Sequence, residues 1–180
     1  MAGAGAGGRT GAGERRPAGS GAPAARGLEE AGIEVRWARA QKEVAGAFAV
    51  RERVFVDEQG VPAHEELDAH DEHARHAVAL AYGSRVIGTL RLLVDGERAK
   101  VGRVAVDRAW RRRGVASRLL ALALAGAREQ GCTHVRLAAQ VEASELYGKA
   151  GFAVASEVFE EAGIAHVWME LRLAGGAREP

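Results

Sequence analysis

The sequence feature that most constrains the fold is the stretch from residue 101 to 128, which reads VGRVAVDRAWRRRGVASRLLALALAGAR. It begins as a short apolar strand, crosses a basic turn around Gly114 and continues as a run rich in Ala and Leu. Within that run Val115, Leu119 and Leu122 lie at positions i, i+4 and i+7, which is the spacing of a helix with one buried stripe. We therefore expect a strand, a tight turn and a helix that packs on a sheet.

The first turn of this expected helix is its chemically informative part, because unpaired backbone N–H groups and the positive end of the helix dipole lie there. Gly114 and Ala116 carry little side-chain bulk, so a ligand can approach the backbone, and Arg111, Arg112 and Arg113 add positive charge. The combination is typical of a site for a phosphorylated ligand, and a solvated basic turn is the alternative. The stretch has neither the Lys-Ser or Lys-Thr of a Walker A loop nor the G-x-G-x-x-G fingerprint of dinucleotide sites.

The basic turn also fits the pattern Arg/Gln-x-x-Gly-x-Gly/Ala after a strand, filled here by Arg111, Gly114 and Ala116. A later segment, AAQVEASELYGKAGF, places Tyr147 on a short helix before a Gly-Phe pair that opens the next strand. On these two motifs the chain resembles the GNAT superfamily of N-acetyltransferases over about residues 33 to 173. The segments RERVFVDEQGVPAHEELDAHDEHARH and EEAGIAHVWMEL resemble a subgroup of small bacterial acetyltransferases whose acceptors are mostly unassigned.

The resemblance implies acetyl-CoA as co-substrate, with its pantetheine arm in the gap between two parallel strands that splay apart. Backbone groups of the strand at 102–106 would face the pantetheine, the amides of residues 112–117 would hold the pyrophosphate, and the side chains of Arg111 and Arg113 would lie nearest the phosphates; Arg108, outside the motif, is an alternative. The candidate cofactor-binding residues are Val104, Ala105, Val106, Arg111, Arg112, Arg113, Gly114, Val115, Ala116, Ser117, Gln140 and Lys149.

Acetyl transfer to an amine needs a neutral nucleophile, a stabilised oxyanion and a proton for the departing thiolate. Tyr147 matches the family's general acid, since a phenol with a pKa of about 10 is protonated at neutral pH; a core aromatic on an amphipathic helix is the alternative. A strand amide such as that of Val104 would serve the oxyanion. Many superfamily members carry a Glu on the strand before the loop, whereas residues 102–106 read GRVAV. The general base is therefore open, and the candidates are Glu66, Asp68, Glu142 and His166.

A second unusual stretch, residues 59–76, gathers five acidic side chains and four of the six histidines of the chain. Three interpretations of this stretch compete. A metal site is the least favoured, because the stretch has no H-E-x-x-H pair and the chain has one cysteine, and we predict none. A solvated charged loop is another. In the third, carboxylates wall the acceptor pocket and concentrate a protonated amine there. The subgroup resemblance favours the third, with Glu66 and Asp68 as the first candidates.

The whole chain, at 180 residues, suits one domain. We expect an Ala/Gly-rich disordered tail over residues 1–28, an acetyltransferase domain over 29–174 and a frayed end over 175–180. The net charge of +1 argues against a dedicated nucleic-acid binder, although a site built from Arg108 and residues 111–113 is a weak alternative. No stretch is apolar enough for a signal peptide or a membrane span, and a single cysteine fits the cytoplasm.

The order of elements predicts an α/β or α+β fold, and the resemblance makes it GNAT-like: a mixed, mainly antiparallel sheet with a central splay, flanked by helices. We expect strands at 33–38, 76–82, 85–94, 100–106, 134–138, 152–159 and 164–173, with the strand at 134–138 parallel to that at 100–106 because a helix connects them. Helices are expected at 41–58, with Val44, Phe48 and Phe55 inward, and at 141–150. A small-molecule or protein amine is the expected acceptor. The resemblance implies a possible homodimer, although no stretch of the sequence identifies an interface. The alternative function is a non-catalytic acyl-CoA sensor or partner module.

Overall fold

The sheet is the framework of the fold in the computed structural model, which describes residues 32–174; the predicted tail and frayed end lie outside that range. Its strand order is β1-β2-β3-β4-β5-β8-β6, with β7 paired to β8. Within residues 32–174 only β4 and β5 pair in parallel, which confirms a mixed, mainly antiparallel sheet. The strands are β1 (Glu34–Trp37), β2 (Arg75–Ala81), β3 (Arg85–Asp95), β4 (Arg98–Val106), β5 (His134–Gln140), β6 (Ala153–Val154), β7 (Phe159–Glu161) and β8 (Ile164–Arg172).

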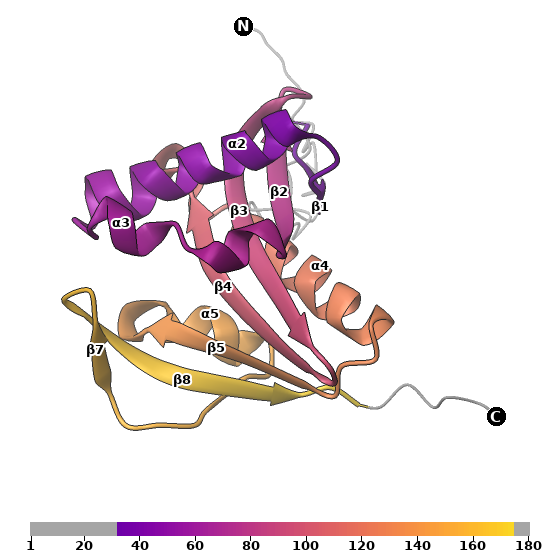
Figure 1. Cartoon of the computed structure of the whole chain (residues 1–180), viewed down its shortest axis with the longest axis vertical. Helices are drawn as coiled ribbons and strands as arrows, with labels where there is room; N and C mark the ends of the chain where they lie inside the picture. Colours follow the sequence, from indigo (N-terminus) through magenta and orange to yellow (C-terminus); the bar gives the residue numbers. More distant parts are fainter. Residues whose placement is uncertain (1–31, 175–180) are drawn as a thin grey trace, which may run out of the picture.

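Helices cover both faces of this sheet, with α2 on one face and α4 and α5 on the other (Figure 1). Each face therefore has its own apolar core, and the larger one lies under α4. The helical elements are α2 (Gln41–Arg51), the π-helical segment η1 (Glu52–Glu58), α3 (Ala63–Glu66), η2 (Ala69–Glu72), η3 (Arg108–Trp110), α4 (Val115–Glu129), η4 (Val141–Ala143) and α5 (Ser144–Lys149).

The central strands β4 and β5 pair only at one end and then diverge (Figure 1). Their parallel ladder joins residues 98–100 to residues 134–136, and beyond it β5 continues to pair with β8 up to Gln140 and His166. The register between β3 and β4 shifts between Thr89 and Arg91, so β4 carries one extra residue there, a β-bulge that bends the strand. The predicted central splay is thus confirmed.

Close packing holds the start of α4 against the sheet beside this splay. A Cβ built at Gly88 of β3 would lie 3.1 Å from Val115 Cγ1 and 3.4 Å from Leu119 Cδ1, so the helix approaches β3 as closely as a glycine permits. Val115 and Leu119 are buried as predicted, whereas Leu122 is only half-buried. The first turn of α4 is consequently fixed at the edge of the splay.

Two sequence-based predictions about helices are wrong in detail. The helix predicted over 41–58 is α-helical only to Arg51 and continues as η1. Its fully buried side chains include Ala47 and Val50, while Val44 and Phe48, predicted to point inward, are half-buried. The helix approaches the sheet through its small residues, which periodicity among large apolar residues does not reveal.

The single strand predicted over 152–159 is also wrong, because the structure has two short strands, β6 and β7, separated by an irregular segment. Ser156 lies in that segment, and its Oγ accepts the backbone N–H of Trp168 at 2.9 Å. The Ser156 hydroxyl thereby accepts the Trp168 N–H, which a backbone carbonyl would accept if the strand continued. The loop predicted over 59–75 similarly contains the short helices α3 and η2.

Candidate functional site

A cavity of about 710 Å³ fills the splay and reaches from the start of α4 to the β7–β8 hairpin. The structure brings most of the predicted site residues together in its lining: Glu66, Val104, Ala105, Val106, Arg111, Arg112, Gly114, Val115, Ala116, Ser117, Gln140 and Tyr147. Three predicted residues lie outside the lining, namely Asp68, Arg113 and Lys149. Lys149 instead pairs with Glu145 at 2.7 Å on the surface of α5.

The start of α4 presents free backbone donors at one end of this cavity. Gly114 is the N-cap residue with φ of 77°, and Arg112 also has a left-handed backbone, with φ of 60°. The first hydrogen bond of the turn runs from the Arg118 N–H to the Gly114 carbonyl at 3.1 Å. The amides of residues 115–117 precede that bond, so none of them has an intrahelical acceptor. Free amides, a left-handed turn and the positive end of a 15-residue helix are the features that favour an anion.

The three arginines of this turn have different surroundings. Arg111 donates through Nε to the last carbonyl of β4 at 2.9 Å and through Nη2 to Glu58 at 2.7 Å. The guanidinium of Arg113 lies 5.1 Å from the ring centroid of Trp110. The side chains of Arg111 and Arg113, the predicted phosphate ligands, therefore both contact protein groups. Arg111 and Arg112 line the cavity, and Arg113 does not.

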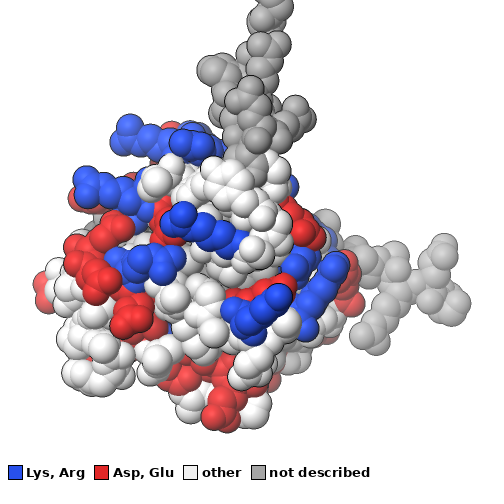
Figure 2. Space-filling model, turned by 90° about the horizontal axis from the view of Figure 1, so that it is seen from above, with Lys and Arg blue, Asp and Glu red and all other residues white. Residues whose placement is uncertain are grey.

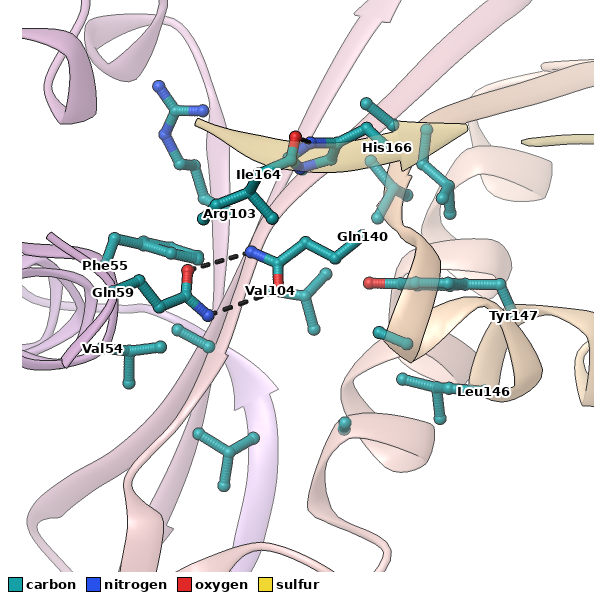
Figure 3. Close-up of a pocket in the computed structure, with 18 of the residues that line it drawn as sticks. Val54, Phe55, Gln59, Arg103, Val104, Gln140, Leu146, Tyr147, Ile164 and His166 are labelled. Carbon is teal, nitrogen blue, oxygen red and sulfur yellow. Dashed lines mark hydrogen bonds between the residues drawn. The ribbon is translucent and has the colours of Figure 1, made fainter. Parts of the chain in front are cut away.

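Tyr147 lies on α5 and directs its hydroxyl into the cavity, toward Gln140 (Figure 3). Its ring is 7% exposed and packs edge-on against Phe152, with centroids 6.2 Å apart. Burial raises the pKa of the Tyr147 hydroxyl to about 12. Among residues 32–174 no group hydrogen-bonds this hydroxyl, so a protonated phenol faces the cavity with its proton available.

Opposite Tyr147, the bulge of β4 forms the other wall of the splay. Arg103 sits in the bulge with φ of 53°, and Val104 follows it in the cavity lining (Figure 3). The Arg103 guanidinium donates to the backbone carbonyls of Glu65 and Glu66, each at 3.0 Å. A non-glycine residue with this backbone is uncommon, and these bonds hold it in place.

A pair of amide side chains bridges the two walls. Gln59, at the end of η1, and Gln140, at the end of β5, exchange two hydrogen bonds of 2.9 and 3.3 Å (Figure 3). Arg53 of η1 also binds Asp107 through two bonds, of 2.9 and 3.0 Å, just after β4. The π-helical segment is therefore attached to both diverging strands, and the predicted cofactor residue Gln140 is half of the bridge.

The acidic loop is bound to buried arginines. The wholly buried Arg51 binds Glu66 and Asp71, and Arg91 binds Asp68 at 2.7 Å. Burial opposes ionisation of Asp68 and Asp71, but the hydrogen bonds from these arginines outweigh it and hold the pKa of each carboxyl below its usual value. These three carboxylates form an ion-pair network whose side chains are buried at Glu66 and Asp71 and half-buried at Asp68. Only Glu66 of the predicted pair reaches the cavity.

Sequence reasoning missed the arginines of this network. Arg51 and Arg91 stand inside apolar runs, AGAFAVRERV and GTLRLLV, where a charged side chain needs a buried partner. An arginine inside an apolar run was the available signal. It would have pointed to the acidic loop as the source of partners.

Outside the cavity, three properties of the described residues bear on function: surface charge, metal ligands and membrane-spanning helices. In the view of Figure 2, basic and acidic side chains are interspersed over the visible face. Between residues 32 and 174 no three His, Cys, Asp or Glu side chains cluster as metal ligands would. Nor does that range contain a helix with the length and apolarity to cross a membrane.

Comparison with known proteins gives a consistent result. The acetyltransferase (GNAT) domain family matches residues 40–173. YjcF of Bacillus subtilis, an uncharacterized N-acetyltransferase, is 35% identical over 133 residues, which cover 73% of this chain and 94% of that protein.

Solved structures agree with this match. A Lactobacillus plantarum protein attributed to the N-acetyltransferases superposes with a TM-score of 0.73 at 29% identity, covering 79% of this chain and 99% of that one. An acyl-CoA N-acyltransferase of Pseudomonas aeruginosa superposes with a TM-score of 0.66 at 30% identity, covering 77% and 97%. The region matched by the family, residues 40–173, contains every residue that lines the cavity.

Proposed function

The chain belongs to the GNAT acetyltransferase family, whose reaction is acyl transfer, and from this membership we propose that it moves the acetyl group of acetyl-CoA to an amine acceptor by direct attack in a ternary complex. One observation carries the proposal. A single cavity connects the free amides at the start of α4 with the Tyr147 hydroxyl and opens toward the β7–β8 hairpin. An acyl-CoA and an acceptor can thus enter from opposite ends.

The fit of the described residues to acetyl-CoA supports this choice. The amides of 115–117 and the Arg112 side chain suit a diphosphate, and the β4 backbone over 104–106 lines a channel for the pantetheine arm. A GNAT family acetyltransferase from Elizabethkingia anophelis, which shares the fold at a TM-score of 0.60 and 16% identity, has acetyl-CoA bound. The bound thioester supplies the activated acetyl group.

The residues around the splay would perform the transfer as follows. The backbone amide of Val104 would donate to the oxyanion that develops on the acetyl carbonyl. The Tyr147 hydroxyl would give its proton to the departing thiolate, and its raised pKa keeps that proton in place at neutral pH. We assign Glu66 and Asp68 to holding the acceptor wall, because Arg51 and Arg91 already occupy their carboxylates.

Release of free coenzyme A across a panel of primary amines tests the proposal. We expect release that depends on the amine and saturates with it, and a fall in that release when Tyr147 is changed to Phe. A non-catalytic acyl-CoA sensor would keep the same cofactor site, so tight acetyl-CoA binding without release from any amine would establish the sensor instead. Absence of acetyl-CoA binding at millimolar concentration would remove both functions.

A further inference from the structure

The acceptor end of the cavity contains one histidine, His166, on β8. Its Cα partner in the sheet is Gln140, the last residue of β5, so His166 stands beyond the β4–β5 ladder, where the two strands have separated. Figure 3 shows it beside the cavity. The residue is 9% exposed and lines the cavity. Tyr147 reaches the same gap from α5, on the other face of the sheet. The two side chains therefore approach the splay from opposite sides.

A backbone contact fixes the protonation pattern of the His166 ring. Nδ1 lies 2.8 Å from the carbonyl oxygen of Ile164. A carbonyl oxygen can only accept, so Nδ1 carries the hydrogen and, in the neutral ring, Nε2 carries a lone pair. Within residues 32–174 nothing hydrogen-bonds Nε2. The ring thus offers a free proton acceptor beside the cavity.

Aromatic packing holds the ring in this orientation. Phe159 of β7 stacks on His166 with centroids 5.9 Å apart and an interplanar angle of 25°. The same Phe159 stacks on Trp168 at 5.6 Å, which ties the hairpin to the next position of β8 that faces the same way. A base fixed by a hydrogen bond and a stack needs little reorganisation when substrate arrives.

The carboxylates of the site are less suited to removing a proton. Glu66 is bound by Arg51 and lies 3.4 Å from Arg103, and Asp68 lies outside the lining. Only exposed acids at the rim remain, of which Glu142 on η4 is the strongest competitor.

We propose that Nε2 of His166 is the general base of the transfer, an inference that rests on the proposed function. Nε2 takes one proton from the acceptor ammonium, and the neutral nitrogen forms the new N–C bond. As the C–S bond breaks, the thiolate takes the Tyr147 proton, and the second surplus proton on the nitrogen restores the phenol through water. His166 then releases its proton to solvent, so one acceptor ammonium and one thioester give one amide, one thiol and one proton.

Other charged groups face the same end of the cavity and contribute to the field at the ring. They come from several elements around the splay and include Lys100 and Arg103 on β4, Glu65 and Glu66 on α3, Glu142 on η4 and Glu161 on β7. The acceptor amine adds its own ionisation to the pH–rate profile, so only the part of an acidic limb that is lost in the His166 variants reports the imidazole.

Two variants of His166 test the assignment. His166→Phe keeps a ring to stack on Phe159 and removes the base, and His166→Gln keeps polarity without a base. For both we expect kcat/KM at pH 7 to fall by about 10²- to 10³-fold, with the dissociation constant for acetyl-CoA within twofold of wild type. The loss should shrink as pH rises toward the pKa of the amine, because the acceptor then arrives neutral. His134→Gln, at the far end of β5, is the control and should match wild type.

A wild-type acidic limb in both His166 variants would overturn the proposal. If Glu142→Gln then lacks that limb, the base is Glu142 instead. Failure of the proposed function looks different, since wild-type protein would then release no coenzyme A with any amine at any pH.

Discussion

Replacing Tyr147 with Phe separates catalysis from folding more cleanly than any other single change in this site. The substitution removes one oxygen and leaves the buried ring and its contact with Phe152 in place. Since no described residue hydrogen-bonds the hydroxyl, we expect the free energy of unfolding to change by about 0.5 kcal/mol or less. The proton donor to the thiolate is lost, so kcat should fall by about 10²- to 10³-fold.

The raised pKa of Tyr147 makes the prediction specific for an acid. With a pKa of about 12, roughly one phenol in ten thousand is ionised at pH 8. Wild-type kcat should therefore show no decline from this group up to about pH 10. The free energy of unfolding, unlike kcat, should depend on pH above 10. Between pH 10 and 12 the folded protein keeps the Tyr147 proton while the unfolded chain loses it, so the wild-type protein should lose more stability over that window than Tyr147→Phe.

The assay is thiol release at saturating acetyl-CoA, with urea denaturation on the same samples. The chain has only one other tyrosine, Tyr82, which is 74% exposed and absent from the cavity lining, and Tyr82→Phe is the matched control. Equal kcat in wild type and Tyr147→Phe would refute the role of this hydroxyl.

Two further substitutions test the cofactor loop and the buried network. Gly114→Ala places a Cβ on a left-handed residue at the start of α4, so we expect acetyl-CoA affinity by calorimetry to drop by about tenfold; unchanged affinity would contradict a site on these amides. Arg51→Met leaves Glu66 and Asp71 buried without their main cation and should lower unfolding free energy at pH 7 by about 3 kcal/mol. Because Arg51 helps to hold the pKa of Asp71 down, the deficit should narrow as pH falls below about 4, and a loss under about 1 kcal/mol at pH 7 would contradict the network.

The cofactor end of the cavity was predictable because its determinants are local. The apolar spacing after Gly114 gives α4, and the small residues of its first turn leave the amides accessible. The parallel relation of β4 and β5 follows from the helix between them. Such short-range patterns are readable in a single sequence.

The acceptor end was less predictable because its contacts span long separations. Arg51 binds Glu66 fifteen residues away, and Arg103 reaches the Glu66 carbonyl across thirty-seven. Nothing in the spacing of the acidic loop indicates that buried arginines occupy its carboxylates. The stacking of Phe159 on His166 and Trp168 likewise depends on how the β7–β8 hairpin closes. Here tertiary structure decides which acids and bases are free.

The central claim is that the amides at the start of α4 hold the diphosphate of an acyl-CoA in the splay. Calorimetric titration of the protein with acetyl-CoA and, separately, with S-acetylpantetheine, which has the thioester arm but no diphosphate, tests it most directly. We expect one acetyl-CoA bound per chain and affinity for S-acetylpantetheine weaker by about 100-fold, since charge-assisted hydrogen bonds to the diphosphate are absent. Equal affinities, or no heat with acetyl-CoA at millimolar concentration, would contradict it.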